Sequence, residues 1–238
     1  MISIHHQPRT PVTTERVFAV FCFRYDANLV PDLLTNIRPL VDGWVAWDDR
    51  ASTEFYSDEP ARRHRLLEAA KAAGADWVLA VDPDERFEAG LAEAMPQLTE
   101  ALGPVAYSFA LREMFTTQHY RVDGVWGQKR QTRLFRLPSQ WQPQPRPLHT
   151  PWDRMIPDVQ VVNTAFNLYH LKMLTPERRA ARAALYTHLD PDWKYQPIGY
   201  GYLADDSDAV LEAISPDRSF TPAHSDDGEL WMPHLPRA

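Results

Sequence analysis

The sequence predicts an α/β fold in which a mainly parallel sheet is covered by helices on both faces. Two observations lead to this prediction. Segments with helical features separate several apolar runs of strand length, and those runs are apolar throughout, as in sheets that are buried on both faces. The runs are residues 17–23, 44–47, 77–81, 105–111 and 132–137, with residues 166–171 as one more candidate.

Helices are expected between and after these runs. Residues 29–37 carry apolar side chains at helical spacing. The next helix follows an entry signal at residues 57–60 and ends at Gly74, a natural C-terminal cap. Further helices are expected over residues 88–102 and 175–188, and the last of them opens with a threonine cap and a proline.

Composition and charge limit the classes of function. The chain has 238 residues, 44% of them hydrophobic, and a net charge of −7, which disfavours binding to nucleic acid or anionic membranes. No apolar run approaches the roughly 20 residues of a membrane span, so no transmembrane segment is expected. The N-terminus lacks the apolar core of a signal peptide and Cys22 is the single cysteine. We therefore expect a cytoplasmic protein.

One main domain is expected, with an extension at each end. Residues 1–16 are assigned to an N-terminal arm and residues 17–190 to the α/β domain. Residues 191–238 are assigned to a C-terminal extension that either packs on the domain or trails from it, because the chain becomes polar and rich in proline.

Charged side chains directly follow three of the predicted strands. Arg24 follows the first, Asp48 and Asp49 follow the second, and Asp82 and Asp84 follow the third. Because ligands bind beyond the carboxyl ends of parallel strands, we expect these five side chains to share one site. Divalent cations prefer such carboxylate oxygens, although an acidic turn can also simply cap a helix.

The stretch GADWVLAVDPDERFE resembles the Asp-x-Asp-Glu signature of family 2 inverting glycosyltransferases with the GT-A fold. Three further stretches resemble segments of that family in the same order: WVAWDDRASTEF, QKRQTRLFRL and NLYHLKMLTPERR. The resemblance covers residues 17–190. It implies a GT-A fold, a manganese or magnesium ion, a nucleotide-sugar donor with UDP favoured as the nucleotide, and a carbohydrate or other hydroxyl acceptor.

The resemblance also implies roles for individual residues. Asp82 resembles the aspartate that contacts the donor, Asp84 the metal-binding aspartate, and His170 the histidine that completes the metal site. Asp48 or Asp49 matches the carboxylate that binds the base. Arginines suit diphosphate contacts because their fork pairs with phosphate oxygens. The expected donor-binding set is Arg24, Asp48, Asp49, Arg65, Asp82, Arg130 and Arg133, with Arg62 and Arg63 as competitors of Arg65; the expected metal ligands are Asp82, Asp84 and His170.

The general base is the weakest part of the resemblance. Inverting transfer needs a group that deprotonates the acceptor hydroxyl. Members of the family often carry His-Glu after the Arg-Leu-Phe-Arg segment, whereas here His149 is followed by a threonine. We expect Asp153 to act as the base, with Asp158, Glu113 or His149 itself as alternatives.

Two other functions stay open. A nucleotidyltransferase also combines acidic groups with a cation, although such enzymes usually begin with a glycine-rich loop that CFRYDANLVPD lacks. An inactive GT-A-like module that binds a sugar or a partner would explain the missing His-Glu.

Two aromatic segments are also of interest for the acceptor. Trp141 and Trp152 flank the proline-rich loop and are candidates for an acceptor platform, with ordinary packing as the alternative. The Gly-Tyr-Gly-Tyr run at residues 199–202 is either a lid hinge or a turn.

Overall fold

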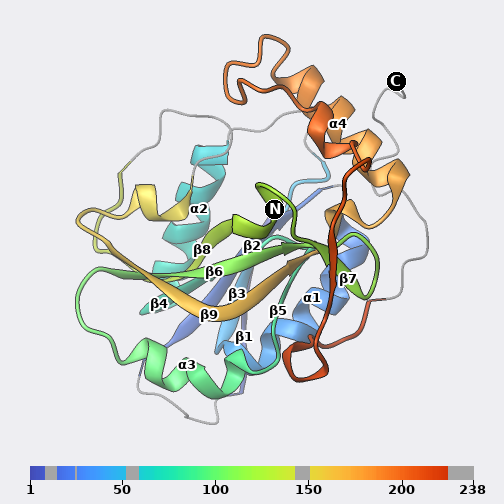
Figure 1. Ribbon diagram of the computed structural model, residues 1–238. Coiled ribbons are helices and arrows are strands. Elements are labelled where there is room, and N and C mark those ends of the chain that lie inside the picture. The colour runs from blue at the N-terminus through green and yellow to red at the C-terminus, as the bar shows by residue number, and fades with distance from the viewer. Residues whose placement is uncertain (9–14, 25, 52–58, 143–150, 225–238) are drawn as a thin grey trace.

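The computed structural model describes residues 1–8, 15–24, 26–51, 59–142 and 151–224. Eight strands of these residues form one curled sheet, and a separate pair forms a small second sheet (Figure 1). In spatial order the main sheet contains β1 (Ile2–His6), β3 (Gly43–Asp48), β2 (Val17–Phe23), β4 (Trp77–Ala80), β8 (Arg130–Arg136), β6 (Val105–Glu113), β9 (Gln160–His170) and β5 (Glu85–Phe87). The second sheet pairs β7 (His119–Arg121) with β10 (Leu211–Ala213).

Four α-helices occur in the described residues: α1 (Val30–Ile37), α2 (Glu59–Ala72), α3 (Leu91–Thr99) and α4 (Pro176–Leu189). The α/β class is therefore as predicted. The side chain of Thr175 caps α4 by accepting a hydrogen bond from the backbone N–H of Arg178, as its sequence suggests. No helix in the described part of the chain is both long and apolar enough to cross a membrane.

The sheet is mixed, as the sequence analysis expects, but its antiparallel pairs outnumber its parallel ones, whereas the sequence analysis expects parallel pairs to dominate. In the described sheet, β2 runs parallel to β3 and β4, and β6 runs parallel to β9. The other four adjacent pairs are antiparallel. The reason lies in the connection from β6 to β8, which contains β7 and a short 3-10 turn but no α-helix. Such a connection favours an antiparallel neighbour, because parallel pairs need a longer crossover, usually through a helix.

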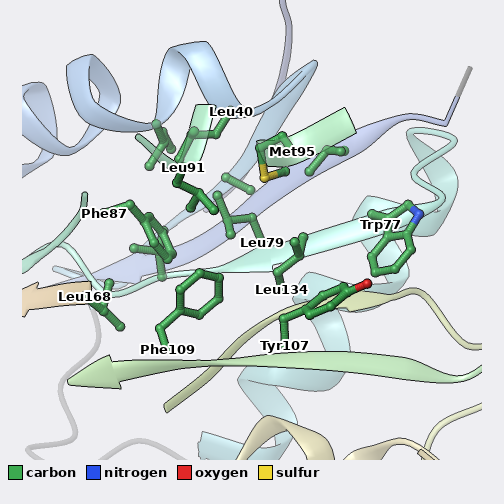
Figure 2. Packing of buried hydrophobic residues seen from close by; sticks show 14 of the residues in the cluster. Leu40, Trp77, Leu79, Phe87, Leu91, Met95, Tyr107, Phe109, Leu134 and Leu168 are labelled. Atoms are coloured by element: carbon green, nitrogen blue, oxygen red, sulfur yellow. The ribbon is translucent and has the colours of Figure 1, made fainter. Parts of the chain in front are cut away.

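Helices cover both faces of the sheet, as predicted. On one face, α1 and α3 bury Leu33 and Leu91 against Leu79 of β4, and Figure 2 shows the packing of this core. On the other face, α2 buries Leu67 beside Trp152. Each fully buried leucine contributes roughly 1.5–3 kcal/mol relative to exposure. The two cores together fix the strand ends at which charged side chains gather.

The two terminal segments take part in the fold. Residues 2–6, inside the expected arm, form the edge strand β1, and the N-terminal amine donates a hydrogen bond of 2.8 Å to the carbonyl of Asp48. Most of β1 is exposed, so it lacks the apolar run by which the other strands were predicted. The C-terminal extension packs on the domain through residue 224, where Phe220 is buried beside Tyr169.

Candidate functional site

The acidic turn between β4 and β5 is locked by its own side chains. The backbone N–H of Asp82 donates to the Glu85 carboxylate, and the backbone N–H of Glu85 donates back to the carbonyl of Asp82, both at 3.0 Å. The turn holds its carboxylates in different environments. The side chain of Asp82 is 54% exposed, whereas those of Asp84 and Glu85 are buried.

Arg133 neutralises two of these carboxylates. Its Nη2 atom lies 2.9 Å from the more exposed Asp82 and 2.5 Å from Glu85, and burial strengthens the contact with Glu85. Arg133 reaches them because β8 runs antiparallel beside β4. The sequence analysis placed Arg133 at the site through a resemblance, and the structure brings it together with Asp82.

Asp84, His170 and Glu113 form a buried chain of polar groups. His170 Nε2 lies 3.4 Å from Asp84 Oδ1, and His170 Nδ1 lies 3.0 Å from Glu113 Oε2. Burial and Lys172 lower the pKa of His170, but the two carboxylates outweigh them and raise it to about 9. Burial alone would raise the pKa of Glu113, but Lys172, His170 and Lys129 hold it well below its usual value.

These three polar groups provide only some of the ligands that a divalent cation needs. Across the described residues, no group of three or more His, Cys, Asp and Glu side chains is arranged to hold a metal ion. Asp84 Oδ1 and His170 Nε2 are nevertheless close enough to contact one cation. The carboxylate of Glu113 behind Nδ1 directs Nε2 toward Asp84, as carboxylates commonly do behind a metal-binding histidine. A cation here would have two protein ligands and take the rest from substrate oxygens and water, as magnesium often does.

A cavity of about 460 Å³ opens beside these groups. Its lining contains five lysine and arginine side chains against four carboxylates, so it is locally basic although the whole chain carries a charge of −7. The basic side chains are Arg63, Lys129, Arg133, Lys172 and Arg182, and the acidic ones are Glu59, Asp82, Glu85 and Glu113. Such a cavity suits an anionic ligand accompanied by a cation.

A second charged cluster lies beyond β2 and β3. Asp49 is 8% exposed, and its Oδ2 atom lies 3.8 Å from Arg24 and 3.6 Å from Arg62. Arg62 also lines a small hollow that contains Asp82, so it links this cluster to the acidic turn. Asp48 instead pairs at the surface with Arg50, whose hydrogen bonds lower the pKa of Asp48 to about 2. Of the two aspartates, Asp49 is the one that shares the interior with the arginines.

Three further predicted site residues, besides Arg24, Asp48, Asp49 and Asp84 described above, are not among the described residues that line the cavity. Arg65 is exposed and lies over the ring of Trp47, so its neighbours Arg62 and Arg63 on α2 are the arginines that face the site. Arg130 donates to the carbonyls of Ser108 and Thr164 and thereby bridges β6 to β9. The third residue is Asp153, which is the second residue of the 3-10 turn Trp152–Met155; His149 lies outside the described residues.

Several cavity residues carried no assigned role in the sequence analysis. Lys172 lies in the 3-10 turn directly after β9 and Arg182 lies on α4, and sequence spacing gave no reason to select them from the other basic residues of that region. Glu113 was only an alternative base, although its position at the end of β6 is the signal that places it near the other strand ends. The tyrosines at residues 186–202 were also missed, apart from the Gly-Tyr-Gly-Tyr run.

Comparison with known proteins assigns this chain to no family. A scan against models of protein families and a search of curated proteins find no match to this chain.

Proposed function

We propose that this chain is a metal-dependent inverting glycosyltransferase of the GT-A type, which moves a sugar from a nucleotide-diphosphate donor to a hydroxyl acceptor. The observation that supports this most is the pairing of Asp84 with His170 beside a basic cavity that Asp82 and His170 both line. Asp82 and Asp84 follow β4, whereas His170 ends β9, so distant parts of the sequence meet beyond the end of β4.

The donor would lie with its diphosphate against the basic side of the cavity. A bound cation would supply charge neutralisation to the diphosphate as it leaves. Asp84 and His170 would hold that cation, and Glu113 would keep the imidazole in the tautomer that presents Nε2. Lys172 and Arg182 line the same cavity and would stabilise negative charge on the leaving group, because preorganised cations act strongly in a partly enclosed site.

A general base must come from a side chain within reach of the acceptor. Among the three glutamates of the described cavity lining, Glu59 suits this role best because its side chain is 21% exposed, whereas those of Glu85 and Glu113 are 1% and 2% exposed. Burial raises the pKa of Glu59, although Arg63 partly offsets the effect, and a base works best with a pKa closer to the working pH. The pKa of Glu113 is held well below its usual value, which makes Glu113 a weaker base than Glu59.

Calorimetric titration tests the donor site directly. UDP, GDP and dTDP are each titrated with and without manganese into the wild type, Asp84→Ala and Asp153→Ala. We expect one nucleotide to bind only with manganese, with loss of binding in Asp84→Ala and none in Asp153→Ala. Failure of every nucleotide to bind to folded wild-type protein would contradict the proposal and favour a non-catalytic module.

A further inference from the structure

One part of the cavity lining differs from the rest because it is built mainly from tyrosine side chains, and Arg182 and Lys194 lie over the rings of Tyr186 and Tyr195. The described residues on this wall are Tyr186 of α4 and a cluster from the segment that follows it. That segment leaves α4 and belongs to the C-terminal extension (Figure 1). We refer to the following set as the tyrosine wall: Tyr186, Tyr195, Gln196, Tyr200, Tyr202 and Leu203.

Asp190 fixes the backbone of the tyrosine wall. This carboxylate is 2% exposed and accepts hydrogen bonds from the backbone N–H groups of Lys194, Tyr195 and Gln196 at 2.8, 3.0 and 3.2 Å. It also accepts a hydrogen bond of 2.9 Å from the hydroxyl of Tyr200. Four donors on one buried carboxylate hold the segment in a single path, so the cavity surface is formed before any ligand arrives.

The rings are held as well as the backbone. Tyr186 and Tyr200 stack with centroids 5.2 Å apart and an interplanar angle of 22°. Tyr202 packs against Trp126 at 5.5 Å, and its hydroxyl accepts a hydrogen bond of 3.1 Å from the Gln196 amide. Tyr186, Tyr195 and Tyr202 are each partly exposed, so they offer aromatic surface and polar atoms together.

We infer that the tyrosine wall binds the acceptor and that the acceptor is a carbohydrate, an inference that rests on the proposed glycosyltransferase function. A sugar ring presents C–H groups on its faces and hydroxyls around its edge. Aromatic faces pack against the former, while phenol and amide groups can hydrogen-bond to the latter.

The tryptophans that the sequence analysis considered for this role lie elsewhere. Trp141 donates a hydrogen bond of 2.7 Å to His64, and Lys71 lies over its ring. Trp152 is buried against Phe135 on the α2 face of the sheet. Two residues of the run at residues 199–202, Tyr200 and Tyr202, line the cavity.

Saturation-transfer NMR with sugar probes tests the inference apart from the donor site. The probes are methyl glycosides of glucose, galactose, mannose and N-acetylglucosamine, together with cellobiose and maltose. They are added to the protein in the presence of manganese and the nucleotide found by calorimetry. If no nucleotide binds, they are added to the protein alone. The variants are Tyr195→Ala with Tyr202→Ala, the ring-preserving Tyr195→Phe, and Trp141→Ala as a matched aromatic control outside the wall. Calorimetry of the nucleotide on each variant reports on the donor site.

We expect saturable binding of at least one probe to the wild type, weakened about tenfold in the double alanine variant and largely kept in Tyr195→Phe and Trp141→Ala. Nucleotide binding should stay within about twofold in all four proteins. The inference is overturned if no probe binds saturably, or if the double variant binds as well as the wild type. If the wild type binds none of the nucleotides, that result instead contradicts the proposed function, whether or not a sugar probe binds.

Discussion

Arg218 holds Glu88, the residue directly after β5, because its Nη2 and Nε atoms donate to Glu88 Oε2 at 2.9 and 3.1 Å. The same oxygen accepts a hydrogen bond of 2.9 Å from the backbone N–H of Asn167 on β9. The C-terminal segment, the end of β5 and strand β9 therefore meet at one carboxylate. Whatever weakens this contact should loosen the support of the metal-binding candidates.

Arg218→Ala should lower the free energy of unfolding by about 1–2 kcal/mol, because it leaves the buried Glu88 carboxylate without its cation. This cost is small because the Arg218 side chain is 37% exposed and solvent screens its interaction with Glu88. Urea unfolding monitored by tryptophan fluorescence measures the change. Arg38→Ala, at an exposed arginine on the surface, is the control and should change stability by less than about 0.5 kcal/mol. Equal changes in the free energy of unfolding for the two variants would show that the contact between Arg218 and Glu88 contributes no more to stability than an exposed surface side chain does.

Glu113→Gln should weaken manganese binding about 10- to 100-fold, because the amide supports the imidazole of His170 less well than a carboxylate does. Titration of manganese, followed by electron paramagnetic resonance of the free ion, gives the dissociation constant. Asp153→Asn serves as the comparison and should bind manganese like the wild type, since Asp153 is not among the described residues of the cavity lining. An unchanged constant in Glu113→Gln would remove Glu113 from the metal site.

Arg63→Ala should weaken nucleotide binding by roughly tenfold, the cost of one charge-assisted hydrogen bond. Arg63 lines the cavity and lies over Trp152 with its guanidinium carbon 4.5 Å from the ring centre. Arg65→Ala, on the same helix but exposed, should change the affinity by less than about twofold. Calorimetry of both variants decides between the arginine that the sequence analysis preferred and the one that faces the cavity. The reverse order of effects would return the role to Arg65.

The stability provided by Asp190 should depend on pH in the acid range. Burial alone would raise the pKa of Asp190, but hydrogen bonds from Tyr195, Tyr200, Gln196 and Lys194 outweigh it and lower the pKa. A group with a lowered pKa stabilises the fold fully above its ordinary value of about 3.9 and loses that contribution as the pH falls through the lowered value.

Thermal unfolding of the wild type and Asp190→Asn between pH 8 and pH 3 measures this contribution. The wild type should melt at a higher temperature than the variant, by a constant margin above about pH 5 that narrows below about pH 4. Thr187→Ala, on the exposed side of α4, is the control and should give a margin that does not vary with pH. A margin between the wild type and Asp190→Asn that persists down to pH 3 would contradict the assigned role of the carboxylate.

Much of the fold could be predicted because β2 and β4 are apolar throughout and α4 opens with a threonine cap. β2, β4 and α4 follow their predicted bounds to within two residues. Strand direction could not be predicted in the same way, since the antiparallel position of β8 depends on which strands pair and not on local sequence. β1 was missed because an exposed edge strand has little apolar character.

The candidate site could likewise be predicted from the sequence only in part. Asp82, Asp84, Arg133 and His170 carried a signal in the motifs around them, and the structure brings them together. Arg65 and Arg130 were selected by their place in those motifs, but the direction of a side chain is set by packing, which places one over Trp47 and the other across two strands. No motif marks the tyrosine wall, which is assembled from a helix and a loop.

The carboxylate of Asp190 holds the loop after α4 mainly through backbone N–H groups, which every residue except proline can supply. The side chains at positions 194–196 are therefore free to vary while the loop keeps its course. Selection or laboratory engineering could exchange them to recognise different partners at this wall without rebuilding the charged half of the cavity. The path of the loop therefore depends on one buried aspartate, whereas its binding specificity depends on side chains that can change.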